Sequence, residues 1–348
     1  MNDALMALPS DFVRRLSQLI PQKNLPDVIA GFTTERVTTF RVNTIKTDAE
    51  TLRTRLASRG IIAEQVSWLP GAFILKNSSL RSLTELTEYH DGLFYVQSLS
   101  SMIPALILDP KPGERILDIA AAPGSKTTQI AALMENTGEI VANDTSQNRI
   151  YRLEANLKTQ GVTIAKIHKG DGRSIWQQYP EYFDKTLVDA PCSLEGRFST
   201  LDPKSYADWS LKKVRDLSLL ERWLLRSAVS STKKGGIIIY ATCTLSPEEN
   251  EGVVDWLLGK DKHAVEIESV STAAPRLRPP ILTWGGKPYN AALSRAVRVY
   301  PTTETEGFFV VRLKKIHSTV PAGFSPGKVQ TVLHQKFQKS RKRNSRHF

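Results

Sequence analysis

Cysteine is scarce in this chain, whose 348 residues contain only Cys192 and Cys243. Two cysteines cannot form the disulfide framework of a small secreted protein, so we expect a reducing compartment. No apolar run has the length of a membrane span, and the first residues, Met-Asn-Asp-Ala-Leu, lack the basic-then-apolar order of a signal peptide. We therefore predict a cytoplasmic protein without membrane association.

Regular metal-ligand spacing is also missing. The chain has six histidines, and they are scattered. Zinc sites in proteins need histidine and cysteine ligands at short, recurring intervals. We predict no bound metal ion.

Acidic residues are absent from the last tenth of the chain. From Lys314 to the C-terminus there are nine Lys or Arg and no Asp or Glu, in a chain with a net charge of +12. Such an excess favours a polyanionic partner, and nucleic acid is the commonest one in a cytoplasm. A solvated basic tail has the same composition. Apolar residues at helical spacing predict a short amphipathic helix there: Val329, Val332, Leu333 and Phe337.

From Gly113 onward, strand-like and helix-like segments alternate. Short β-branched runs bounded by Gly and Pro, separated by helical stretches, are typical of a parallel α/β sheet. Strands are predicted at 115–119, 139–143, 164–168, 185–189, 236–241, 298–300 and 308–313. Helices are predicted at 125–134, 147–159, 212–231 and 248–257. The last two strands are expected to form an antiparallel hairpin around a polar turn at 302–306.

A smaller unit precedes this domain. A strand at 38–43, a helix at 49–58 and strands at 61–68 and 72–76 predict a βαββ unit. A helix is expected from Ser10 until Pro21, and another is expected over 95–108. The predicted organisation is a helical segment at 1–34, a small α+β domain at 35–90, an α/β domain at 91–318 and a basic tail at 319–348.

Both cysteines directly follow predicted strands. Ligands of parallel α/β sheets bind outside the carboxyl ends of the strands. If the strands before Cys192 and Cys243 are neighbours, about 5 Å apart, the two thiols converge on one cleft. The alternative is that each cysteine is a small buried hydrophobic residue. That alternative is weakened because both of the only two cysteines occupy strand ends.

A loop of small residues follows the first strand of the α/β domain. It lacks the three spaced glycines of a dinucleotide fingerprint and the Gly-x-x-x-x-Gly-Lys of a P-loop. The next two strands end near Asp144 and Asp171, whose carboxylates suit ribose hydroxyls, although either acid alone is often a helix cap. A loop of small residues with two acidic residues and no phosphate-binding motif favours a nucleoside cofactor, S-adenosylmethionine. The candidate cofactor-binding residues are Ala120, Ala121, Ala122, Pro123, Gly124, Ser125, Lys126, Asp144, Asp171 and Asp189.

Several segments, in order, resemble one enzyme family. They are Phe40-Arg41-Val42-Asn43, 92–97, 120–127, Asp189-Ala190-Pro191-Cys192-Ser193, 241–244 with Glu248-Glu249-Asn250, and 307–310. The chain resembles the NOL/NOP/Sun family of RNA cytosine-C5 methyltransferases, most of all the bacterial RsmF type. The resemblance implies a class I methyltransferase Rossmann-like sheet after an RNA-recognition-like domain. It also implies that Cys243 attacks the base, that Cys192 assists release, and that S-adenosylmethionine binds at the candidate positions.

Two features depart from that family. Leu194 stands where many members have Gly, directly beyond the Pro-Cys motif. RsmF-type enzymes also carry a further C-terminal RNA-binding domain, whereas this sequence has the short basic tail. These departures bear on the RNA target and not on the chemistry. The resemblance to the RsmF type favours ribosomal RNA as the substrate, with transfer RNA as the alternative, and no obligate protein partner is evident.

The predicted chemistry explains the residue types. C5 of cytosine is a weak nucleophile, and a thiolate added at C6 turns the ring into an enamine that accepts a methyl group at C5. Asp189, as a protonated acid, is placed to stabilise the N3 side, and the base must be unpaired or flipped out. Stacking on that base or core packing are alternative roles for Phe198, Tyr206 and Trp209.

Three other interpretations compete with this one. An amino-group methyltransferase of the same fold would need no thiol. A non-catalytic RNA-binding assembly factor would not need both thiols and a complete cofactor site. A redox switch would join Cys192 and Cys243, which requires Cα atoms within about 7 Å.

Overall fold

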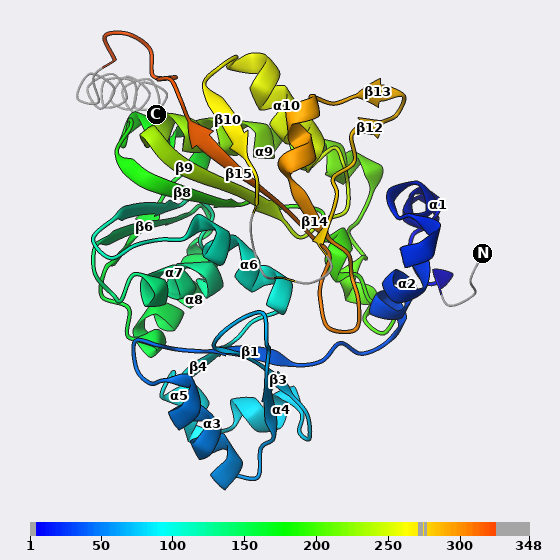
Figure 1. Cartoon of the computed structure of the whole chain (residues 1–348), viewed down its shortest axis with the longest axis vertical. Helices are drawn as coiled ribbons and strands as arrows, with labels where there is room; N and C mark the ends of the chain where they lie inside the picture. Colours follow the sequence, from blue (N-terminus) through cyan, green and yellow to red (C-terminus); the bar gives the residue numbers. More distant parts are fainter. Residues whose placement is uncertain (1–4, 271–273, 275–276, 325–348) are drawn as a thin grey trace, which may run out of the picture.

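The structure, a computed structural model, describes residues 5–270, 274 and 277–324 (Figure 1). These residues form a four-stranded sheet, a nine-stranded sheet and a two-stranded hairpin. In Figure 1 the four-stranded sheet lies below the large sheet, and helices α1 (Ser10–Leu19) and α2 (Leu25–Thr33) lie at its side. The amphipathic tail helix predicted around Val329 lies outside the described residues.

The small sheet has the order β2-β3-β1-β4, and all its strand pairs are antiparallel. Its elements are β1 (Thr39–Val42), α3 (Ala49–Ser58), β2 (Ala63–Gln65), β3 (Ala72–Leu75), α4 (Leu80–Thr84), α5 (Thr87–His90) and β4 (Phe94–Val96). The predicted βαββ core is present. The sheet also has a fourth strand, β4, which lies past the expected boundary at residue 90.

The helix predicted over 95–108 was wrong at its start. Tyr95 and Val96 belong to β4, and helix α6 begins only at Leu99 (Leu99–Leu108). Phe94 pairs across the sheet with Val42, and its ring lies 5.0 Å from that of Phe40. Burial of this aromatic side chain in the small core therefore outweighs the helical pattern that continues into α6.

The large sheet has the order β11-β14-β15-β9-β8-β5-β6-β7, with β10 paired to β15. Strands β5 to β9 are parallel, whereas β10, β14 and β15 join in antiparallel fashion. The strands are β5 (Arg115–Asp118), β6 (Glu139–Asp144), β7 (Ala165–Lys169), β8 (Phe183–Asp189), β9 (Thr232–Thr242), β10 (Val265–Glu268), β11 (Leu277–Arg278), β14 (Val297–Val299) and β15 (Phe308–Lys315). The predicted Rossmann-like sheet and its terminal hairpin are both confirmed.

Helices cover both faces of this sheet. On one face, α9 (Leu211–Ser231) and α10 (Glu251–Lys260) pack against Val188 and Tyr240. On the other, α6 and α7 (Ser125–Leu133) pack against Leu187 and Ile239. Helix α8 (Gln147–Gln160) lies between β6 and β7 in the chain. Alternate residues of β8 and β9 thus enter opposite cores, as expected for strands buried on both faces.

The topology brings the two cysteines to one edge. Strands β8 and β9 are parallel neighbours, with Asp189 opposite Ala241. Cys243 directly follows β9, and Cys192 lies three residues past the end of β8. Their Sγ atoms lie 3.4 Å apart, so the predicted convergence is confirmed. Within the described part of the chain, no helix combines the length and the apolar character that a membrane crossing requires.

Candidate active site

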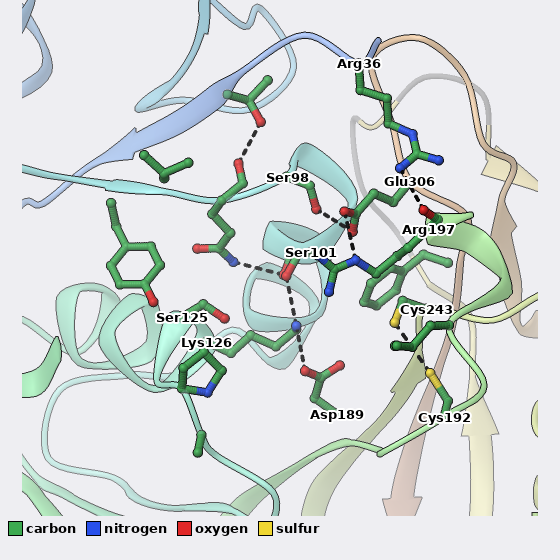
Figure 2. Close-up of a pocket in the computed structure, with 18 of the residues that line it drawn as sticks. Arg36, Ser98, Ser101, Ser125, Lys126, Asp189, Cys192, Arg197, Cys243 and Glu306 are labelled. Carbon is green, nitrogen blue, oxygen red and sulfur yellow. Dashed lines mark hydrogen bonds and ion pairs between the residues drawn. The ribbon is translucent and has the colours of Figure 1, made fainter. Parts of the chain in front are cut away.

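The two thiols face each other in one cavity. The Sγ atoms of Cys192 and Cys243 lie 3.4 Å apart, and both cysteines are free. They line a cavity of about 580 Å³ that opens beyond the carboxyl ends of β8 and β9. Figure 2 shows the two sulfur atoms pointing toward each other at one side of this cavity. Cys192 is 7% exposed, whereas Cys243 is half-buried and the more accessible of the two.

A buried ion pair forms the neighbouring wall. Nζ of Lys126 lies 2.7 Å from Oδ2 of Asp189 and 2.9 Å from Oγ of Ser101 (Figure 2). Lys126 is in the first turn of α7, and Asp189 ends β8. Sequence reasoning placed Lys126 with the cofactor loop and Asp189 as a protonated acid. In the structure the two side chains contact each other in the thiol cavity, and both of those roles stay predictions.

Charged side chains surround the mouth of this cavity. Glu306 forms an ion pair with Arg197, whose Nε lies 3.2 Å from Oε1, and accepts a hydrogen bond from Oγ of Ser98 at 2.9 Å. Arg36 donates to the carbonyl of Phe198 at 2.8 Å. Figure 2 shows Arg36, Arg197 and Glu306 grouped together on the side opposite Asp189. Sequence reasoning missed these residues because they come from three segments far apart in the chain.

Asp144 and Asp171 line a second, smaller cavity of about 190 Å³. The Asp144 carboxylate is buried and accepts from the backbone N–H of Ser146 at 2.9 Å and of Ala122 at 3.3 Å. Asp171 is held by Arg173, whose terminal nitrogen lies 2.6 Å away. A Cβ on Gly172 would meet Leu224 at 2.8 Å, so glycine leaves this space open. Two carboxylate acceptors beside apolar side chains suit an adenosine group. The carboxylates can accept from its hydroxyl and amine groups, and the apolar side chains can contact its aromatic ring.

Some residues of the loop at 120–126 line the cavities, and others hold the loop in place. Ala120 lines both cavities, and Ala122, Pro123, Ser125 and Lys126 line the larger one. Ala121 donates its N–H to the carbonyl of Asn143 at 2.7 Å. Gly124 has φ +107°, and a Cβ there would meet Leu153 at 2.9 Å. The Ala121 and Gly124 contacts hold the loop against β6 and α8, so their part in cofactor binding stays a prediction.

Arg149 is a site residue that sequence reasoning did not select. It lines both cavities, donates to the carbonyl of Ala122 and lies 3.4 Å from Asp144. Nothing in the sequence marks it, because basic residues in the first turns of exposed helices are common. The three aromatic side chains considered for stacking lie in the core of the N-terminal helices, since the Phe198 ring is 4.9 Å from that of Phe12.

A close contact and burial raise the pKa values of two groups near the strand ends. The contact with Cys243, and then burial, raise the pKa of the Cys192 thiol well above its ordinary value. Burial also raises the pKa of Asp118 to about 7, although Thr127 donates a hydrogen bond to its carboxylate at 2.6 Å. Among the described residues no group of three or more side chains is arranged to hold a metal ion.

These features define a Rossmann-like methyltransferase with two thiols in its reaction cavity. The chain belongs to the 16S rRNA methyltransferase RsmB/F family, whose model matches residues 105–314. A model of the N-terminal domain of 16S rRNA methyltransferase RsmF matches residues 8–99. The predicted membership in the RNA cytosine-C5 methyltransferases is thereby confirmed.

Curated relatives modify two kinds of RNA. The tRNA (cytosine(49)-C(5))-methyltransferase of Pyrococcus abyssi is 40% identical over 79% of this chain and 87% of its own length. The ribosomal RNA small subunit methyltransferase F of Pectobacterium atrosepticum is 37% identical over 92% of this chain. The chain spans only 66% of the length of that second relative.

Solved structures agree with this assignment. A methyltransferase homolog from Pyrococcus horikoshii superposes with a TM-score of 0.74 at 31% identity, covering 89% of this chain and 100% of the other. NSun6 from Pyrococcus horikoshii, solved with SFG, has a TM-score of 0.76 at 25% identity, covering 90% of this chain and 100% of the other.

Proposed function

We propose that the chain transfers a methyl group from S-adenosylmethionine to C5 of a cytosine in RNA through a covalent cysteine adduct. The observation that carries this proposal is the pair of thiols 3.4 Å apart beside the Lys126–Asp189 ion pair. An amino-group methyltransferase has no use for two facing thiols. A scaffold without activity has no need for a cavity that keeps them accessible.

Cys243 is the attacking residue. The raised pKa of Cys192 keeps that thiol protonated and therefore a poor nucleophile, and its sulfur lies 3.4 Å from Sγ of Cys243. The greater exposure of Cys243 also allows the cytosine ring of the RNA to reach its sulfur atom. Addition of Sγ to C6 makes C5 nucleophilic. After methylation a water held at Cys192 takes the C5 proton, the C5–C6 double bond re-forms and the Sγ–C6 bond breaks.

Lys126 and Asp189 act on the N3 side of the ring. Electron flow from C6 into the ring builds negative charge at N3, which a proton donor relieves. Asp189 accepts a hydrogen bond from Nζ of Lys126, and the Lys126 ammonium is the source of that proton in this proposal. Lys126 is 5% exposed, and its charge is therefore weakly screened.

The smaller cavity is the cofactor site. Asp144 and Asp171 would hold the ribose and the amine of adenosine, and Leu224 would contact its ring. When bound, S-adenosylmethionine supplies an electrophilic methyl group. Ala120 and Pro191 line both cavities, so a cofactor in one has a path to a base in the other.

The substrate we propose is ribosomal RNA, in the cytoplasm. Matches to both RsmB/F and RsmF models, which together extend over residues 8–99 and 105–314, support it. The 40% identity to a tRNA enzyme makes transfer RNA the second candidate. Bisulfite sequencing of RNA from a strain without the gene separates them, because the lost 5-methylcytosine identifies both the molecule and the position.

The two thiols provide the direct test of the chemistry. Cys243→Ala should form no adduct and should not methylate RNA. Cys192→Ala should attack normally but release slowly, so a covalent RNA–protein species should survive denaturing electrophoresis. If only Cys243→Ala accumulated the covalent RNA–protein species, Cys192 would be the attacking residue and Cys243 the one that assists release. If neither variant formed this species, covalent catalysis would lose its support.

A further inference from the structure

The residues that follow the two cysteines are bonded to each other. Oγ of Ser193 lies 2.8 Å from Oγ1 of Thr244, and both side chains are buried. One loop therefore touches the other immediately behind the facing thiols. The backbone adds a second link, because the N–H of Gly196 donates to the carbonyl of Cys243 at 3.0 Å.

A buried glutamate on the loop after Cys243 binds the loop after Cys192. Glu249 accepts from the backbone N–H of Ser193 at 2.7 Å with Oε1, and from the Ser193 hydroxyl with Oε2. Both carboxylate oxygens thus bind the residue next to Cys192. Glu249 is 0% exposed, and it follows Cys243 by only six residues.

A second glutamate makes the reciprocal contact. Glu195, on the Cys192 loop, accepts from Oγ of Ser246 on the Cys243 loop at 2.7 Å. It also accepts from Nε1 of Trp209 at 3.0 Å. Each cysteine loop therefore carries one serine and one glutamate that bind the opposite loop, and both glutamates are fully buried. These reciprocal buried contacts restrain the two loops relative to each other, although Oε2 of Glu195 has no hydrogen-bond partner among the described residues.

We propose that Glu249 is a positioning residue that, through Ser193 and Thr244, holds Cys192 opposite Cys243 for the release of the methylated base. The role of release rests on the proposed function, whereas the alignment of the thiols does not. Glu249 reaches the thiols only through Ser193. Its effect is therefore on the geometry of Cys192 rather than on the reacting atoms.

The two-oxygen contact makes the proposal specific. Glu249→Ala removes both acceptor oxygens and leaves the backbone N–H and the hydroxyl of Ser193 without this partner. The loop must then shift, and misplacement by about 1 Å of a reacting group lowers rates by about a hundredfold. Attack by Cys243 should be less affected than release, because the contact is to the residue beside Cys192.

The alignment can be measured without RNA. The full-length protein is oxidised with excess oxidised dithiothreitol, which takes two electrons and two protons from the thiols as the Cys192–Cys243 disulfide forms. The rate reports how often the sulfur atoms meet. Glu249→Ala should form this disulfide about tenfold or more slowly at a temperature where it is folded. Glu249→Gln is the matched control, because its amide can keep both contacts to Ser193 and should restore a rate near that of the wild type.

The same variants are then assayed on RNA. Glu249→Ala and Ser193→Ala should both accumulate covalent adduct and lose turnover by about ten- to a hundredfold, and the two changes together should cost no more than either alone. Glu249→Ala with wild-type disulfide and release rates would overturn the proposal. If Cys192→Ala forms no RNA adduct but Glu249→Ala still slows the disulfide in the protein with both cysteines, the alignment stands and the proposed function fails.

Discussion

The two cavities at the sheet edge are constructed differently. The thiol cavity is lined by side chains held in buried contacts, among them Lys126 at 5% exposure and Cys192 at 7%. In the smaller cavity, Asp171 and its partner Arg173 have side chains 42% and 53% exposed. Exposed ion pairs contribute little and rearrange easily, whereas buried ones keep a single geometry. The comparison indicates that the groups of the thiol cavity and Asp144 are preorganised, whereas the exposed Asp171–Arg173 pair of the smaller cavity can adjust to a ligand.

Lys126→Met gives the sharpest test of this contrast. It removes the proposed proton source for N3 while keeping the length of the side chain. Turnover should fall by about 10²–10⁴-fold, the usual effect of losing a general acid. Cofactor affinity, measured by calorimetry, should change by less than about threefold, because Nζ points to Asp189 and Ser101. Loss of affinity with unchanged turnover would instead place Lys126 in the cofactor site.

Asp118, between the two sites at the end of β5, predicts a dependence of stability on pH. Its pKa is raised from 3.8 to about 7, mainly by burial. Between about pH 4 and 7 the folded protein keeps a proton that the unfolded chain releases, so stability falls as pH rises through this window and levels off above it. The fall is at most about 1.4 kcal/mol for each pH unit.

Asp118→Asn should remove this fall while retaining an acceptor for Thr127. Urea unfolding of both proteins at pH 5 and pH 7 measures it, and the variant should lose less stability than the wild type between the two. Other titrating groups are common to both proteins and cancel in the difference. Equal pH dependence would show that Asp118 ionises normally in the folded state.

The sequence predicted this architecture best where local pattern and burial agree. Parallel strands ending at the two cysteines were readable because each is a short apolar run bounded by turn residues. The start of α6 was misplaced because Phe94 serves the small core from a strand, a long-range requirement absent from the local pattern. Ser193 and Glu249 were visible as parts of recurring motifs, but their contact depends on the distance between loops 56 residues apart in sequence.

Asp144 and Asp171 should respond unequally to substitution. Asp144→Ala should weaken cofactor binding by roughly 1.5–3 kcal/mol, the scale of a charge-assisted hydrogen bond from a buried carboxylate. Asp171→Ala should cost only about 0.5–1.5 kcal/mol, because its carboxylate is already shared with Arg173 and partly hydrated. Calorimetry on the folded variants gives both values. The reverse order would mean that the exposed acid is the principal contact.

Leu194 carries the smallest expected effect, and it reports the backbone of the thiol cavity. This residue has φ +64°, lines the cavity beside Cys192 and is 39% exposed. A side chain with a Cβ is strained in the left-handed region, whereas glycine is not. Leu194→Gly should therefore be more stable than Leu194→Ala by about 1 kcal/mol, although glycine is normally the less stabilising residue. Both variants remove the same apolar wall, so their difference in urea unfolding isolates the backbone contribution. An alanine variant as stable as the glycine variant would mean that the loop relaxes to negative φ at no cost, contrary to a preorganised Cys192 loop.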